Sequence, residues 1–375
     1  MSFSIVTHRN HCRAVSAAEI QSAEPTGPCL TIRMPPADPA VLQGIVLKPD
    51  LSMVRSAGHS PAFPGGFLAR LDGGTLIPPY SQLADGSTVL WDSWYQWGGQ
   101  EAIDRHRQAI ETHFKQPRRS VSVPGSHIAL ARDCDLNWGH WLIEIVPSLA
   151  LAEGLPALAD AKVVVPAGLS PTQRELLSAV GVSEDRLLLY PPDQGVYEFE
   201  RLYWPSSSFH LGMMSPHVPV WLKSKLFQAY GIPDRSTRRR LYVSRQDAPR
   251  ARIRNEDELI ARLIPEGYEI VVPSQLSLAE QVALFASADV VMGPHGAGLT
   301  STIFCQPDTL LISLNERDGW FMSFSAWCGF VYGATELNGI DFDPVTEDGA
   351  VNIDHVLHFA DWMIRTRDAE RRSGA

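Results

Sequence analysis

The sequence lacks the marks of a membrane, secreted or disulfide-bonded protein. No part of its 375 residues approaches the roughly 18 consecutive apolar residues of a membrane-spanning helix, and residues 1–15 hold no apolar core of signal-peptide length. The five cysteines are odd in number and scattered, without a Cys-x-x-Cys pair, which argues against a disulfide framework or a zinc site. We expect a cytoplasmic protein in reducing surroundings, which leaves room for peripheral contact with a membrane surface.

An excess of positive charge is also missing. The formal net charge is -10, which argues against a nucleic-acid partner. Hydrophobic residues make up 45% and charged residues 20% of the chain, as in ordinary globular proteins. The length suits two domains of about 100 to 200 residues each.

Composition and alternation divide the chain into five parts. Residues 1–119 are rich in proline, glycine and short apolar runs, and predict strands and loops with one helix. Residues 120–230 alternate strands with helices, and 231–240 read as a hinge. Residues 241–335 alternate more regularly and predict a parallel, doubly wound sheet. Residues 336–375 form a tail whose amphipathic segment predicts a docking helix.

One helix in the first domain carries both polar and apolar residues of interest. A predicted strand at 126–131 leads into a segment with apolar residues at helical spacing, and Asn137 precedes that segment. His140 and Glu144 are four residues apart and share one face, which we expect to be the polar one. Pro147 predicts a kink or a division of the helix, because proline removes a backbone donor.

In the second domain the predicted elements follow one another closely. Strands are expected at 241–244, 268–272, 290–292 and 309–314, with helices at 256–264 and 278–287. Asn255 with Glu258, and Ser277 with Glu280, predict capping boxes at the two helix starts.

A glycine-rich corner, Gly293–Gly298, lies between the predicted strand at 290–292 and a helix-like segment at 299–305. Glycines allow a ligand to approach the backbone closely, and the amides of a first helical turn favour an anion. The alternative is a turn that merely needs glycine, with His295 as a structural hydrogen-bonding residue.

Arginines crowd the carboxyl end of the first strand of this domain. Arg245 follows that strand directly, and Arg252 and Arg254 precede Glu256. Ligands of open α/β sheets bind at the carboxyl ends of the strands, where the glycine corner must also lie. Guanidinium groups there suit a phosphate or diphosphate. For Arg238, Arg239 and Arg240 we favour a solvated basic loop.

The sequence gives less support to three other kinds of ligand site. The second strand of the domain ends in Val272-Pro273-Ser274, without the acidic residue that a dinucleotide fold uses for ribose. No lysine of a Walker-type loop follows the glycines. The Asp-x-Asp triplets at 133–135 and 341–343 could hold a divalent metal against a diphosphate. Arginines and helix amides would make a metal unnecessary, so we expect no required cofactor.

Four motifs in order give a resemblance to a known family. They are Asn137-Trp138-Gly139-His140-Trp141, then Tyr242-Val243-Ser244-Arg245, then Arg254-Asn255-Glu256, and then His295-Gly296-Ala297-Gly298 with Phe304 and Pro307 downstream. Over residues 120–314 the chain resembles the family 61 glycosyltransferases, which include plant xylosyl and arabinosyl transferases, eukaryotic enzymes that add N-acetylglucosamine to proteins, and bacterial enzymes of surface polysaccharides.

The resemblance implies an architecture and a reaction. It implies a GT-B arrangement of two Rossmann-like domains facing a cleft, and transfer from a nucleotide sugar with inversion at the anomeric carbon. The first domain would then bind the acceptor, a glycan, lipid-linked or protein hydroxyl. The second would bind the donor, for which a UDP-sugar is the first choice.

Our hypotheses for the residue roles combine this resemblance with the expected positions of the residues. The donor-binding residues would be Arg245, Arg252, Arg254, Glu256, His295, Gly296, Ala297 and Gly298. Asn137, Trp138 and Trp141 would lie on the acceptor side. Glu144 is the first candidate for the base that takes the acceptor proton, and His140 is the second. A non-catalytic nucleotide- or sugar-binding protein derived from such an enzyme is the main alternative, and a nicotinamide-dependent oxidoreductase is a more distant one.

Overall fold

The structure is a computed structural model of the whole chain. It describes residues 4–6, 13–14, 29–33, 41–47, 53–59, 65–78, 81–90, 99–115, 119–132, 137–191, 195–210, 213–233, 238–316, 320–336, 343, 346 and 348–373. Among these residues, no helix has an apolar stretch long enough to cross a bilayer.

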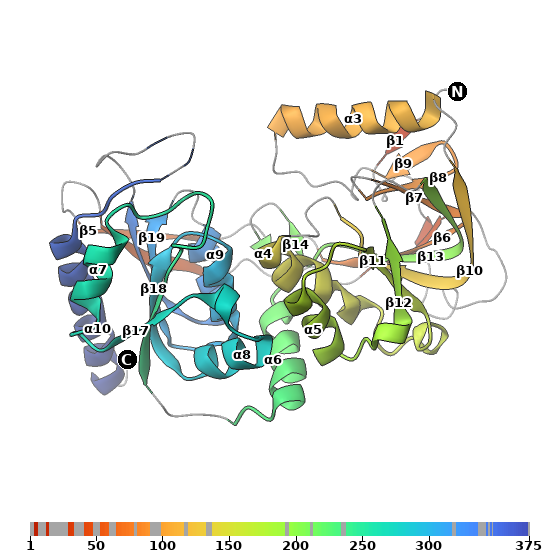
Figure 1. The fold of residues 1–375 in the computed structure, drawn as a ribbon. Coiled ribbons are helices and arrows are strands. Elements are labelled where there is room, and N and C mark those ends of the chain that lie inside the picture. Colours follow the sequence, from red (N-terminus) through yellow and green to blue (C-terminus); the bar gives the residue numbers. More distant parts are fainter. Residues whose placement is uncertain are drawn as a thin grey trace. The chain divides into compact units, whose positions relative to one another are not determined.

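The chain forms two compact units, each of them a mixed α/β structure (Figure 1). The first unit comprises Met1–Ala37 and Pro64–Leu211, and the second comprises Asp38–Phe63 and Gly212–Ala375. Both contain parallel strands joined by helical segments, as the alternation in the sequence predicts. The predicted α/β fold class is therefore confirmed.

The sheet of the first unit has a parallel half and an antiparallel half. The parallel strands run in the order β13 (Val196–Pro205), β10 (Ser120–Ala129), β11 (Lys162–Pro166) and β12 (Leu187–Tyr190). The antiparallel half attaches to β13 through β6 (Phe67–Asp72) and β7 (Gly74–Ile77). Further described strands extend this half: β1 (Ser4–Val6), β2 (Arg13–Ala14), β3 (Cys29–Arg33), β8 (Gln82–Asp85) and β9 (Thr88–Leu90). Among them, β1 pairs with β9 and β2 pairs with β3 in parallel.

Short helical segments connect the parallel strands of the first unit. Between β10 and β11 lie α4 (Trp138–His140), the π-helical turn η2 (Trp141–Ile145) and the 3₁₀ segments η3 (Val146–Leu151) and η4 (Pro156–Leu158). The helix α5 (Pro171–Ala179) begins with a capping box of Ser170 and Gln173, and η5 (Glu184–Arg186) leads into β12. The longer α3 (Gly99–Lys115) precedes β10.

The second unit is built on a seven-stranded sheet in the order β17-β16-β18-β19-β20-β4-β5. Its strands are β16 (Arg239–Val243), β17 (Tyr268–Val271), β18 (Ala288–Pro294), β19 (Leu310–Glu316), β20 (Val331–Glu336), β4 (Val41–Leu47) and β5 (Met53–His59). All neighbours are parallel except β4 and β5. The first five strands form the predicted doubly wound arrangement, in which helices must cover both faces of the sheet.

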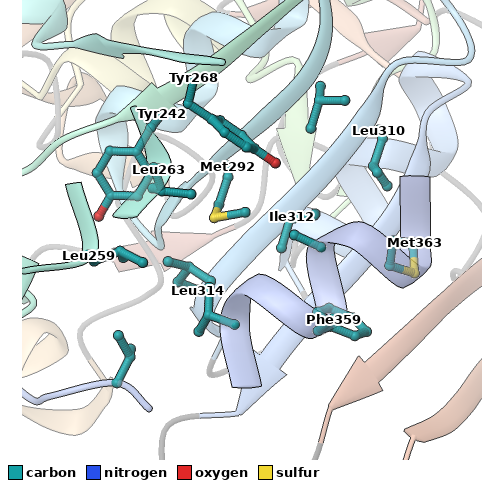
Figure 2. Close-up of a cluster of buried hydrophobic side chains, with 14 of the residues drawn as sticks. Tyr242, Leu259, Leu263, Tyr268, Met292, Leu310, Ile312, Leu314, Phe359 and Met363 are labelled. Carbon is teal, nitrogen blue, oxygen red and sulfur yellow. The ribbon is translucent and has the colours of Figure 1, made fainter. Parts of the chain in front are cut away.

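Helices cover this sheet on both faces. On one face, α7 (Glu256–Leu263) and α10 (Ile353–Ser373) pack apolar side chains against alternate residues of β16, β18 and β19 (Figure 2). The 3₁₀ helix η7 (Ala297–Phe304) lies on the other face, where Leu299 approaches Gly293. The remaining described helices of the unit are α6 (His217–Tyr230), η6 (Pro273–Gln275), α8 (Leu278–Ala286) and α9 (Trp320–Cys328).

The units divide the chain differently from the predicted segments in two places. Residues 38–63, expected in the N-terminal part, contribute β4 and β5 to the second sheet. Helix α6, expected in the first domain, belongs to the second unit, where the Lys223 ammonium donates to the Cys305 carbonyl at 2.5 Å. The units therefore divide after Leu211 and not at the expected hinge, 231–240, whose last two residues are in β16. Both differences concern pairing between segments far apart in sequence, which local patterns do not encode.

The capping predictions had mixed outcomes. Ser277 and Glu280 form the predicted capping box of α8. Asn255 does precede α7, but its side chain makes no capping hydrogen bond, so that prediction is wrong. Its amide instead exchanges hydrogen bonds with the backbone of Val351, at 2.9 and 3.0 Å. The Asn255 side chain therefore bonds to a residue distant in sequence and not to the first turn of its own helix.

Candidate functional sites in the two units

In the first unit, the chain reverses its direction of progress across the sheet between β10 and β13. The path from β10 through β11 to β12 moves one way, and β13 then pairs with the other side of β10. Such a switch point, at the carboxyl ends of the strands, is where open α/β sheets bind ligands. The segment with His140 and Glu144 follows the carboxyl end of β10 and therefore lies at this position.

Asn137 starts that helical segment. Its side-chain oxygen accepts hydrogen bonds from the amides of Gly139 at 2.9 Å and His140 at 3.4 Å, which makes Asn137 the N-cap. The helix then changes type twice. In η2 the Val146 amide donates to the Trp141 carbonyl, five residues back, and η3 carries Pro147 in its first turn. The predicted division of the helix at Pro147 is thus present.

His140 and Glu144 form a close pair on this segment. The His140 Nδ1 atom lies 2.5 Å from the Glu144 Oε1 atom. The Glu144 side chain is only 6% exposed, whereas that of His140 is 24% exposed. Glu144 therefore does not lie on an open polar face as expected, because the turn that carries it packs into the unit. A carboxylate on Nδ1 fixes the imidazole tautomer and leaves Nε2 as the basic nitrogen.

The two tryptophans of the motif differ in position. Trp138 is partly exposed. Trp141 is completely buried, and its indole N–H donates to the Gln173 carbonyl at 3.2 Å. Trp141 therefore packs in the core and does not face an acceptor. Arg132, which the sequence did not single out, is a buried guanidinium after β10 that donates to the Pro205 carbonyl at 2.5 Å and lies over the Trp204 ring.

In the second unit, the switch point lies between β16 and β18. The path from β16 to β17 moves one way, and β18 then pairs with the other side of β16. Arg245 follows the end of β16, and His295 follows the end of β18. The structure therefore brings the predicted arginine and the predicted glycine corner together at one sheet edge.

The glycines of the corner are required by close contacts. A Cβ atom on Gly293 would lie 2.6 Å from the Val243 carbonyl oxygen, and one on Gly298 would lie 3.3 Å from the Val243 side chain. A Cβ on Gly296 would overlap the Arg245 guanidinium. Glycine therefore allows β16 and the guanidinium to approach the corner, which a turn that only needed glycine's backbone freedom would not require.

The backbone of the corner presents amides. The His295 amide donates to the Leu314 carbonyl at 2.8 Å, and the Leu299 amide donates to the Gly296 carbonyl at 3.0 Å in the first turn of η7. The amides of Ala297 and Gly298 precede that first helical bond, so they have no acceptor within the helix. Together with the Arg245 guanidinium, these amides concentrate positive charge at the corner.

Glu256 connects Arg245 to the start of α7. Its Oε1 atom accepts from the Tyr242 hydroxyl at 2.9 Å and from the Arg245 amide at 3.2 Å. The other oxygen, Oε2, is buried and has no hydrogen-bond partner among the described residues. Burial raises the pKa of Glu256, although hydrogen-bonding groups of Tyr242, Arg245 and Ser244 act in the opposite direction. An unsatisfied buried oxygen is costly, and such a group marks a site that a ligand can complete.

Beside Glu256 lies a cavity of about 500 Å³. It is lined by Gln246, Arg252, Ile253, Arg254, Glu256, Asp257 and Asp348. The predicted Arg252, Arg254 and Glu256 therefore share one pocket, and Arg245 lies between this pocket and the glycine corner through its contacts with Glu256 and Gly296. Basic and acidic side chains together suit a ligand that carries both phosphates and hydroxyl groups.

Asp348 lines the pocket although no sequence pattern indicated it. Its carboxylate accepts from the Arg252 amide at 2.9 Å and from the Arg252 guanidinium at 2.9 and 3.3 Å. These hydrogen bonds lower the pKa of Asp348, and the bond from the Arg252 amide has the largest effect. The backbone near Asp348 also pairs with residues 251–255, including a parallel bridge between Ile253 and Gly349. No spacing rule links positions 96 residues apart.

Metal ligands are not grouped in the described part of the chain, where no set of three or more His, Cys, Asp or Glu side chains could hold an ion. The triplet at 133–135 lies outside the described residues. Of the triplet at 341–343 only Asp343 is described, and its carboxylate accepts from the Thr346 amide at 3.4 Å.

Comparison with known proteins agrees with these two positions. A search of curated proteins found no match. The family model described as Glycosyltransferase 61 matches residues 138–312, a region that starts in the His140 segment and ends in β19 beyond the glycine corner. Residues 138–312 therefore form a glycosyltransferase 61 domain, which supports a family 61 glycosyltransferase.

Proposed function

We propose that the protein is an inverting glycosyltransferase that moves a sugar from a nucleoside-diphosphate donor, with a UDP-sugar as first choice, to a hydroxyl of a glycan or other acceptor. A role in surface polysaccharide synthesis fits this activity. The observation that carries the proposal is the contact of the Arg245 guanidinium with Gly296 at adjacent strand ends, beside a pocket with hydrogen-bonding side chains.

The corner is the proposed diphosphate site. Arg245 and the amides of Ala297 and Gly298 would bind the phosphate oxygens, and they would stabilise the charge that develops on the leaving group. The pocket beside Glu256 is the proposed nucleoside site. There the buried Oε2 atom of Glu256 would accept a hydrogen bond from a ribose hydroxyl. Arginine and backbone amides suffice for this chemistry, and we propose no metal step.

His140 is the proposed base, with Glu144 as its positioning group. This order is the reverse of the one that the sequence favoured, because Glu144 is buried while His140 is partly exposed. Glu144 would hold the Nδ1 proton, so that Nε2 takes the proton of the acceptor hydroxyl. The acceptor oxygen then bonds to the anomeric carbon as the bond from that carbon to the phosphate oxygen breaks. Nucleoside diphosphate leaves, and the proton stays on His140.

This mechanism requires a GT-B arrangement, in which the two units face a common cleft. Its acceptor-side contacts are proposed for Trp138, and for Asn137 only through groups that the helix cap does not use. Arg252 and Arg254 remain proposed donor contacts. Both residues are exposed and line the pocket, and the Arg252 guanidinium also pairs with Asp348.

The test is nucleotide release from a panel of donors. The purified protein is first screened by thermal shift against UDP, GDP and CDP sugars, because a ligand that binds only the folded state raises its stability. Release of nucleoside diphosphate is then measured with and without glycan acceptors, and the anomeric configuration of the product is determined by NMR. Binding without any release would favour the non-catalytic alternative, and a retained configuration would contradict inversion.

A further inference from the structure

An aromatic cluster stands at the carboxyl end of β19. Trp320 opens α9 and stacks on Phe324, with ring centroids 5.2 Å apart and an interplanar angle of 19°. Its ring also meets Phe321 edge-on at 4.5 Å. Phe321 and Phe324 are buried, at 1% and 2% exposure, whereas Trp320 is partly exposed. The two phenylalanines thus form a fixed support under a tryptophan that reaches the surface of the unit.

This cluster adjoins the glycine corner. The Phe321 ring packs edge-on against the His295 ring, with centroids 5.0 Å apart and an interplanar angle of 79°. The His295 amide in turn donates to Leu314 in β19, the strand that precedes Trp320. A continuous set of contacts therefore runs from the corner through His295 and Phe321 to Trp320.

The strand order places this cluster opposite the nucleoside pocket. The order β17-β16-β18-β19 puts the segment after β16, which lines the pocket, on one side of β18. It puts the segment after β19, which carries Trp320, on the other side. The glycine corner follows β18 and lies between them. In a nucleotide sugar the diphosphate separates the nucleoside from the sugar, so a nucleoside in the pocket and a diphosphate at the corner leave the β19 side open to the sugar.

We propose that Trp320 binds the transferred sugar of the donor by stacking its indole ring on an apolar face of the sugar ring. The inference rests on the proposed diphosphate site at the glycine corner. Pyranose and furanose rings present C–H faces that pack on aromatic rings, and the tryptophan quadrupole favours such contacts. Support from Phe321 and Phe324 limits the rotation of the indole, so little side-chain entropy is lost when a sugar binds.

The experiment compares the affinity for a nucleoside diphosphate with the affinity for the same nucleotide carrying a sugar. Calorimetry measures the affinity of the full-length protein for UDP and for UDP-glucose, UDP-xylose and UDP-N-acetylglucosamine, with the GDP and CDP counterparts in the same series. Trp320→Ala should weaken the best nucleotide sugar by about threefold to tenfold, while its affinity for the matching nucleoside diphosphate stays within about twofold of wild type. Trp320→Phe should retain most of the affinity, because a flat ring remains.

Trp362→Ala is the matched control. Trp362 is also partly exposed, lies in the same unit and stacks on a phenylalanine, Phe359, but it belongs to α10. It should leave both affinities unchanged, and thermal unfolding reports whether each variant is folded.

Two results would overturn the sugar assignment and leave the proposed function standing: equal weakening of nucleoside diphosphate and nucleotide sugar by Trp320→Ala, or no effect on either. If the wild-type protein binds no nucleoside diphosphate, both the sugar assignment and the proposed function fail.

Discussion

The two units place their candidate residues at the same topological position but build the sites in different ways. In each, the residues lie where the strand path reverses, between β10 and β13 in the first unit and between β16 and β18 in the second. The His140–Glu144 pair comes from a single helical segment, four residues apart. The second site combines the ends of β16 and β18, the start of α7 and a C-terminal segment at Asp348.

The two kinds of site suit different tasks. A local pair on a rigid turn can hold one proton in a defined position, which suits a base. A site assembled from separate segments can surround a long ligand with several kinds of groups, which suits a nucleotide. The proposed division of labour, chemistry at His140 and donor binding at Arg245, follows from that contrast, and the variants below are chosen to separate the two.

The largest effect is expected at His140. His140→Ala removes the proposed base, so turnover should fall by about 10²- to 10⁴-fold. Affinity for nucleoside diphosphate should remain near wild type, because the proposed donor site lies in the other unit. Steady-state kinetics and calorimetry on the same preparation check both values. His358→Ala, an exposed histidine of α10, is the control. Normal turnover in His140→Ala would refute the base assignment.

Arg245→Ala should have the opposite profile. Loss of a charged hydrogen-bonding group at the diphosphate should weaken nucleoside diphosphate binding by about 10- to 100-fold. Arg239→Ala provides the control, because Arg239 lies at the other end of the same strand and pairs with Glu269. Calorimetry should show a large loss in the first variant and none in the second. Equal affinities would remove Arg245 from the donor site.

Glu144→Gln tests whether the carboxylate positions the base or is the base. The amide keeps the shape but can present its N–H to His140 and favour the wrong tautomer. Turnover should fall, by less than in His140→Ala, and the double variant should be no slower than His140→Ala alone because both changes affect one device. Additive losses in the double variant would mean that Glu144 acts independently of His140 and would favour Glu144 as the base.

Glu256→Gln should produce the smallest change. We expect the protein to become slightly more stable and to bind nucleotide less tightly. Burial raises the pKa of Glu256 in the folded protein, so its contribution to stability is complete below the unfolded pKa and is lost as pH rises through the folded pKa. Above that value the buried charge is a cost, which glutamine removes. The temperature of thermal unfolding at pH 8 should therefore rise slightly, while the affinity for nucleotide falls. A variant that is both less stable and unchanged in affinity would make Glu256 purely structural.

Local chemistry in the sequence accounted for much of the second unit. The strand-helix alternation after residue 240 predicted β16 to β19 and the helices between them, and the rule for carboxyl ends placed Arg245 beside the glycine corner. Those inferences succeeded because apolar periodicity and parallel topology are set by nearby residues and a single sheet rule. The four sequence motifs likewise identified the family that residues 138–312 match.

Tertiary structure decided what depends on distant partners. The sequence could not indicate that Trp141 is buried against Gln173 or that Asn255 leaves its helix to bind Val351. Nor could it place Asp348 on Arg252, from 96 residues away. It predicted His140 and Glu144 on one face, but only packing around the π-helical turn buried Glu144 and left His140 partly exposed. Spacing fixes which residues are neighbours along a helix, whereas burial, and with it the choice of base, depends on the rest of the fold.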